Sequence, residues 1–135
     1  MPSFGTLKAD TLTHSTAGSL ATNFVVHGSA KGFVSFKGTS TVTVHDSQNV
    51  SSVTDIDTGR YRPNFTNSMS NDTYSPAGGC FDSGETGSGG HFISLYTDGG
   101  STMATGSLSV STREHVGGGR NDPTQVNITI NGDLA

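Results

Sequence analysis

Short runs in which apolar and polar residues alternate mark most of the chain from residue 22 onward. The alternation is strict in residues 41–45 and 126–130, where every second side chain is aliphatic. This period of two predicts strands that bury one face. Turn-forming residues separate the runs, as in Asp57-Thr58-Gly59, which predicts a hairpin between strands over residues 50–56 and 60–65.

The predicted strands follow one another at spacings of roughly 8–12 residues, which is typical of sandwiches and barrels. They cover residues 24–27, 31–37, 41–45, 50–56, 60–65, 74–81, 91–97, 105–113 and 126–131. We therefore predict an all-β fold: an antiparallel β-sandwich or barrel-like domain of about eight short strands, over residues 22–135, with no helix longer than two turns. Pro63 cannot donate to a ladder, so its strand should lie at an edge or be bulged there.

The apolar members of the alternating runs form the predicted core. They are Phe24, Val26, Phe33 or Val34, Phe36, Val42, Val44, Val53, Tyr61, Phe65, Phe92 or Ile93, Leu95, Leu108, Val110, Ile128 and Ile130. Composition makes this core thin, because Leu, Ile, Val and Phe together supply 27 of 135 residues, whereas Gly, Ser and Thr number 19 each. Such chains commonly bury further apolar area against copies of themselves or in a larger assembly.

Residues 1–21 show no sustained periodicity and predict an extended N-terminal arm. Leu7, Leu12 and Leu20 stand among small and hydroxylated residues and are too sparse for a helix with a core face. An extended arm needs a partner to bury it, and the open sheet edge of a neighbouring subunit is one such partner. We expect the arm to contact an adjacent subunit or a larger shell.

Charge and cysteine content exclude several classes of protein. Seven Lys and Arg residues are dispersed in a chain of net charge −4, so no basic stripe for nucleic acid is present. The chain also has no apolar segment long enough for a transmembrane helix. Cys80 is the single cysteine, which excludes an intramolecular disulfide. The first residues lack the basic start and apolar run of a secretory signal, which predicts synthesis in a cytoplasm.

Patterns that could carry chemistry have simpler explanations. Asp55-Ile56-Asp57-Thr58-Gly59 resembles the opening of an EF-hand loop, but Thr66 occupies the position of the final carboxylate ligand. The five histidines have no short metal-ligand spacing, although a three-histidine site assembled across strands stays possible. The Gly-rich stretches 84–90 and 117–119 lack the Lys-Ser/Thr of a phosphate loop and predict mobile tips that contact a partner. We predict no catalytic, cofactor or metal site.

Two blocks of the chain carry a resemblance. Residues 29–39 read Ser-Ala-Lys-Gly-Phe-Val-Ser-Phe-Lys-Gly-Thr, and residues 49–66 read Asn-Val-Ser-Ser-Val-Thr-Asp-Ile-Asp-Thr-Gly-Arg-Tyr-Arg-Pro-Asn-Phe-Thr. Their order and spacing resemble the "AKAWVNFNGTGT" and "NVSSITDNGTGDYTVNFT" segments of a family of tailed-bacteriophage structural proteins. Residues 6–12 are similar to the "TLKVDTIQ" start of the same proteins. Phe33 stands where the family has Trp, and Pro63 where it has a strand Val.

The resemblance implies a virion structural protein, and two places in the virion are open to it. A capsid decoration (cement) protein, bound on the outside of the head and stabilising the shell, fits the short chain, the arm and the thin core. A tail-fibre or receptor-binding component fits the family, whose members are mostly labelled tail or fibre proteins of marine phages, and the Gly-rich tips. A fibre should also carry a heptad run or a β-helical repeat, which this sequence lacks. We therefore favour the decoration protein.

The expected partners are further copies of the chain, as a homotrimer, and the major capsid protein or other virion subunits. A host-surface receptor belongs to the fibre alternative, and neither nucleic acid nor a membrane is expected. The chain should be made in the host cytoplasm and reside in the virion. Residues predicted to bind partners come from the arm and from two loops: Leu7, Lys8, Leu12, Leu20, Gly87, Gly118 and Arg120.

Overall fold

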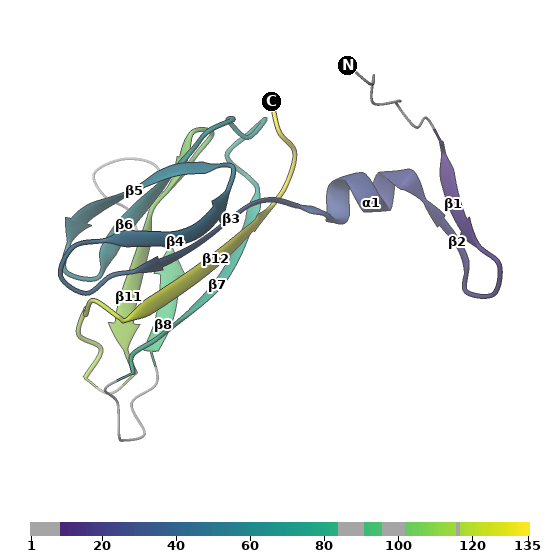
Figure 1. Cartoon of the computed structure of the whole chain (residues 1–135). Helices are drawn as coiled ribbons and strands as arrows, with labels where there is room; N and C mark the ends of the chain where they lie inside the picture. Colours follow the sequence, from purple (N-terminus) through teal and green to yellow (C-terminus); the bar gives the residue numbers. More distant parts are fainter. Residues whose placement is uncertain (1–8, 84–90, 96–101, 116) are drawn as a thin grey trace, which may run out of the picture.

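The computed structural model describes residues 9–83, 91–95, 102–115 and 117–135, and its β-domain consists of two antiparallel sheets that lie face to face (Figure 1). The first sheet has the strand order β4 (Thr43–Gln48), β3 (Ala30–Lys37), β12 (Gln125–Asn131) and β7 (Ser75–Phe81). The second has the order β8 (His91–Leu95), β11 (Val110–Glu114), β6 (Arg60–Phe65), β10 (Ser107–Leu108) and β9 (Met103–Ala104), with β5 (Val50–Asp57) paired to β6. The prediction of an antiparallel all-β fold is confirmed.

A hairpin and a helix precede the first sheet: β1 (Thr11–His14), β2 (Gly18–Ala21) and α1 (Thr22–Gly28). The predicted strand over residues 24–27 is wrong, because these residues lie in α1, and Phe24 and Val26 are 65% and 57% exposed rather than in the core. A run of four apolar residues does not distinguish a strand from a helical turn. The backbone bonds locally instead of across a sheet, and the Ser29 N–H donates to the Val25 carbonyl at 3.1 Å.

Phe36 of β3 and Tyr61 of β6 lie at the centre of the core. Both are fully buried, and their rings pack edge to face with centroids 5.1 Å apart. A second edge-to-face pair, Phe65 and Tyr74, has its centroids 5.7 Å apart. The remaining buried apolar residues are Val34, Val50, Met69, Leu108, Val110, Val126, Ile128 and Ile130. Val42, Val53 and Ile93 pack against this cluster while half-buried.

Two predicted core residues are exposed because they lie on terminal strands. Val44 is 39% exposed on β4, where every residue is exposed, so the strand buries neither face. Leu95 is 51% exposed on β8, the terminal strand of the second sheet. Alternation in the sequence identifies an inward-pointing side chain, but only the neighbouring layer decides whether anything covers it.

The sequence predicts an edge strand or a bulge at Pro63, and the edge is wrong because its strand is interior. β6 pairs with β5 on one side and with β11 and then β10 on the other. The Phe65 N–H donates to the Gly106 carbonyl, so the missing donor of Pro63, two residues earlier, faces the same neighbour. That neighbour is interrupted between β10 and β11 at Ser109, whose N–H donates to Thr102 instead. The break in the neighbouring strand therefore accommodates the proline.

The Asp122 carboxylate ties the two sheets together just before β12 begins. Its Oδ1 accepts hydrogen bonds from the Tyr61 hydroxyl at 2.6 Å and from the Gly59 N–H at 2.7 Å. Gly59 has φ +64° in the β5–β6 turn, and a Cβ there would lie 2.7 Å from the Thr112 carbonyl oxygen. Only glycine fits both the backbone conformation and this close approach.

Replacing Phe36 by Ala tests the assignment of the core. We expect a loss of roughly 3–5 kcal/mol in the free energy of unfolding, because a fully buried ring is removed from a packed interface. Val44→Ala is the control on the neighbouring strand and should cost under about 1 kcal/mol, since Val44 is exposed. Urea unfolding measures both. Equal losses in the two variants would place Phe36 outside the core.

Replacing Tyr61 by Phe tests the hydrogen bond to Asp122. Burial, and then the hydrogen bond to Asp122, raise the pKa of Tyr61 far above its ordinary value of 10.0. The folded protein holds this proton where the unfolded chain releases it, so stability should be complete below about pH 10 and decrease at higher pH. At neutral pH, Tyr61→Phe should cost about 1–3 kcal/mol.

Above about pH 10 the difference between the wild type and the variant should shrink, because the variant has no hydroxyl to ionise at this position. Urea unfolding at neutral and alkaline pH measures this. A constant difference across that range would show that Tyr61 does not carry the alkaline dependence.

Candidate partner-binding surface

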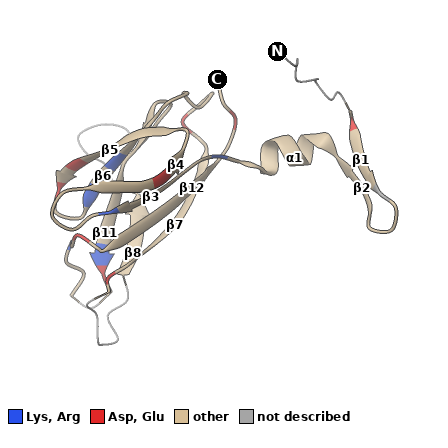
Figure 2. Cartoon of the chain, viewed as in Figure 1, with Lys and Arg blue, Asp and Glu red and all other residues tan. Residues whose placement is uncertain are grey.

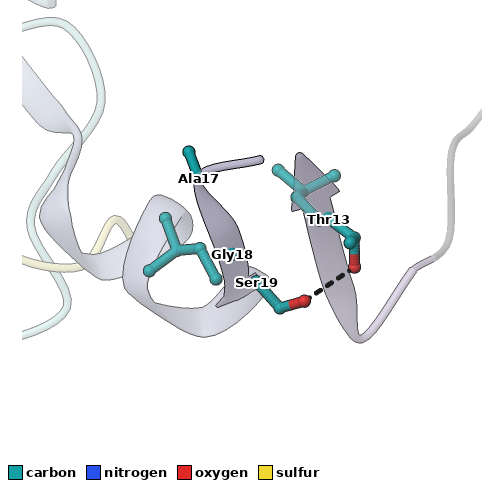
Figure 3. Close-up of a pocket in the computed structure, with 6 residues that line it drawn as sticks. Thr13, Ala17, Gly18 and Ser19 are labelled. Atoms are coloured by element: carbon teal, nitrogen blue, oxygen red, sulfur yellow. Dashed lines mark hydrogen bonds between the residues drawn. The ribbon is translucent and has the colours of Figure 1, made fainter. Parts of the chain in front are cut away.

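The N-terminal segment, residues 9–29, is a hairpin followed by a short helix. β1 and β2 pair antiparallel with Leu12 opposite Leu20, and the hydroxyls of Thr13 and Ser19 are 2.9 Å apart (Figure 3). Thr22 closes the hairpin, since its N–H donates to the Asp10 carbonyl at 2.9 Å and its hydroxyl donates to the Ala9 carbonyl at 2.6 Å. The segment thus has a defined local structure rather than the plain extended form that the sequence predicts.

Apolar side chains of the N-terminal segment are exposed to solvent. Leu12 is 42% exposed and Leu20 48% exposed, and Phe24, Val25 and Val26 of α1 are exposed as well. The hairpin also bears an open hollow of about 460 Å³, drawn in Figure 3 and lined by Leu12, Thr13, Ala17, Gly18, Ser19 and Leu20. Apolar side chains gathered on a segment of this size are typical of a contact surface.

The N-terminal segment projects from the end of the β-domain at which β3 begins (Figure 1). Ser29 alone separates α1 from β3. Exposed polar contacts hold this junction. His27 Nδ1 lies 2.9 Å from Asp133 Oδ1, and the Lys31 ammonium donates to the Val26 carbonyl and to the Ser29 hydroxyl. These contacts fix where the segment leaves the domain without burying its apolar residues.

The structure brings some predicted partner-binding residues together and separates others. Leu12 and Leu20 are cross-strand neighbours in the hairpin. Gly118 is exposed in the loop before β12, where its carbonyl accepts a hydrogen bond from Arg113 at 2.9 Å. Arg120 is half-buried, and its backbone forms a bridge with Arg113. Leu7, Lys8 and Gly87 lie outside the described residues.

The two groups of predicted residues lie at opposite ends of the β-domain. Asn131 pairs with Ala30 of β3 on one side and with Ser75 of β7 on the other. These residues mark the end of the sheet that carries the N-terminal segment. At the other end Gln125 pairs with Phe81, so the loops that follow β7 and precede β12 begin and end there. The arrangement therefore separates an attachment end from a loop end.

Sequence reasoning missed Phe24, Val25 and Val26 as candidate contact residues. Their apolar run was the available signal, and it predicted a buried strand instead. In the structure α1 ends at Gly28 and β3 starts at Ala30, so residues 28 and 29 join a helix to a strand instead of forming a hairpin turn. This consequence is visible only once the start of β3 is known.

The described residues hold no group of three His, Cys, Asp or Glu side chains placed to bind a metal ion. Asp57 Oδ1 accepts from the Thr58 N–H at 2.8 Å, which is turn chemistry rather than cation binding. Burial, and then the nearby Asp122 and Asp57 carboxylates, raise the pKa of Asp55. Burial also raises the pKa of the Cys80 thiol to about 11, so this thiol stays protonated at neutral pH.

No protein-family model, curated protein or solved structure matches the chain. In the part of the chain that the structure describes, α1 is the helix present, and it is too short to cross a membrane.

Deleting residues 1–28 tests whether the β-domain folds without the N-terminal segment. We expect an unchanged strand-dominated circular dichroism spectrum and a change in unfolding free energy under about 1 kcal/mol, because exposed polar contacts contribute little. The control is full-length His27→Ala, which removes the contact with Asp133 alone. Unfolding of the truncated chain would show that the segment belongs to the core structure of the domain.

Proposed function

We propose that this protein is a structural component of a tailed-bacteriophage virion, and specifically a capsid decoration protein that binds the outside of the head. The observation that carries the proposal is the projecting N-terminal segment, whose apolar residues Leu12, Leu20 and Phe24 are exposed. An exposed apolar segment at one end of a small β-domain is suited to assembly on a larger particle. The resemblance of residues 29–39 and 49–66 to phage structural proteins supports the same function.

The separation of two ends supports the orientation of the domain on the particle. The N-terminal segment would lie against neighbouring subunits, and the loop that contains Gly118 would point outward. A decoration protein gains affinity by binding through several copies, because each further contact is intramolecular once the first has formed. Self-association into a homotrimer that contacts the major capsid protein fits this requirement.

A tail-fibre or receptor-binding component is the second candidate, favoured by the same separation of an attachment end from a loop end. Attachment at one end leaves the loops at the opposite end free to meet a host surface, and loops on a rigid β-scaffold commonly carry such contacts. The two candidates differ in the part of the particle that holds the protein.

Locating the polypeptide on the particle tests both candidates. Heads and tails of the phage that encodes the chain are separated, and each is probed with an antibody against the β-domain. We expect the signal on heads, and we expect heads stripped of the protein to release DNA at a lower temperature than heads to which it is added back. A signal confined to tails would overturn the decoration function in favour of the fibre component. Its absence from both would overturn a virion function.

A further inference from the structure

The two sheets leave an apolar opening on the side where β7 and β8 lie against each other. A hollow of about 90 Å³ opens there, lined by residues 76–78 of β7, by Ile93 and Leu95 of β8, and by two core residues behind them. We call this the edge hollow. Its volume lies between the roughly 30 Å³ share of a water molecule and the roughly 150 Å³ of a cavity that binds benzene. The edge hollow therefore suits one aliphatic side chain.

The edge hollow is a gap in the contact between the sheets. Gly78 lets β8 approach β7, since a Cβ at this position would lie 3.1 Å from Ile93 Cδ1 of β8. Leu95 reaches the rim but is 51% exposed. Within the described residues β7 and β8 are the last strands of their sheets, so no further strand covers this side. An apolar rim at two strand edges is a site for association.

The N-terminal segment matches the edge hollow in charge and in chemistry. Residues 11–26 contain no Lys, Arg, Asp or Glu, and neither do β7 and β8. Figure 2 shows charged residues on β4, β5, β6 and β11, whereas the hairpin strands, α1 and β7 carry none. Uncharged apolar surfaces associate without the cost of burying a charge. A two-stranded hairpin is also only marginally stable alone and needs a further layer to pack on.

We propose that the N-terminal segment of one copy docks on the edge hollow of a second copy, inserting one of its aliphatic side chains. A second copy is the occupant because the one-residue connection at Ser29 and the His27–Asp133 contact direct α1 away from its own β-domain (Figure 1). The N-terminal segment is the donor surface and the edge hollow is the acceptor surface. Because the two surfaces are different, each copy can give its segment to one neighbour and receive the segment of another. Contacts of this kind close into rings when the rotation between copies permits.

The oligomeric state of the purified protein in solution, with no other virion component present, tests the proposed docking of one copy on another. Sedimentation velocity should give the full chain a mass that is a small multiple of 13.9 kDa. Deleting residues 1–28 removes the donor, and Leu95→Lys places a charge in the acceptor. Each change should reduce the protein to a monomer. Val44→Lys, at a valine that is 39% exposed on β4, is the control and should leave the oligomer intact.

Mixing the two monomeric variants gives the decisive measurement. The truncated chain retains the edge hollow, and Leu95→Lys retains the N-terminal segment, so together they should form a complex that neither forms alone. Ala77→Arg is a second acceptor variant in case Leu95→Lys disturbs folding, which circular dichroism reports. Either acceptor variant should behave in the same way.

Several results would overturn the proposed docking between copies. A full chain that stays monomeric would do so, as would a truncated chain that still assembles, or a mixture of the two variants with no complex. These results concern the purified protein alone, so they would leave the location on heads or tails, and hence the proposed function, to be decided separately.

Discussion

The Asp122 carboxylate holds the β-domain together at the point where the first sheet meets the second. It binds the Tyr61 hydroxyl and the Gly59 N–H, and the next residue, Pro123, accepts the Gly38 N–H at 2.9 Å. Three chain segments far apart in the sequence are thereby fixed around one buried ring. A carboxylate that receives two hydrogen bonds here compensates for a core that has few large apolar side chains to lock the sheets by packing alone.

The tight packing around Tyr61 is matched by loose packing at the side where β7 and β8 meet. The chain has seven phenylalanines, and Phe24, Phe81 and Phe92 among them are exposed while Phe36 is fully buried. Burial of apolar surface stabilises the folded state, so each exposed apolar side chain is stabilisation that this small core does not gain. Most of the exposed large apolar residues lie on the N-terminal segment and on β7 and β8, and the association that we propose would cover them.

This division of apolar residues connects the fold to the proposed function. The strands of the β-domain carry the segment at one end and the loop with Gly118 at the other, so in the proposed function assembly and display would use separate surfaces. Residues 11–26 and strands β7 and β8 carry no Lys, Arg, Asp or Glu, so the charged residues of the β-domain lie on its other strands and loops, where they keep the outer surface hydrated (Figure 2). In the proposed assembly, one subunit would join others and still present a polar exterior.

The sequence by itself determined the all-β class, most of the strand positions and the centre of the core, because a period of two is a local property of residues such as Val126, Ile128 and Ile130. It also identified Leu12 and Leu20 as residues without a core of their own. Only the tertiary structure decided that Phe24 lies in a helix, that Leu95 is left uncovered and that β6 is interior despite Pro63. Each of these depends on which strand lies alongside, and a strand's neighbours are set by pairings between distant parts of the chain.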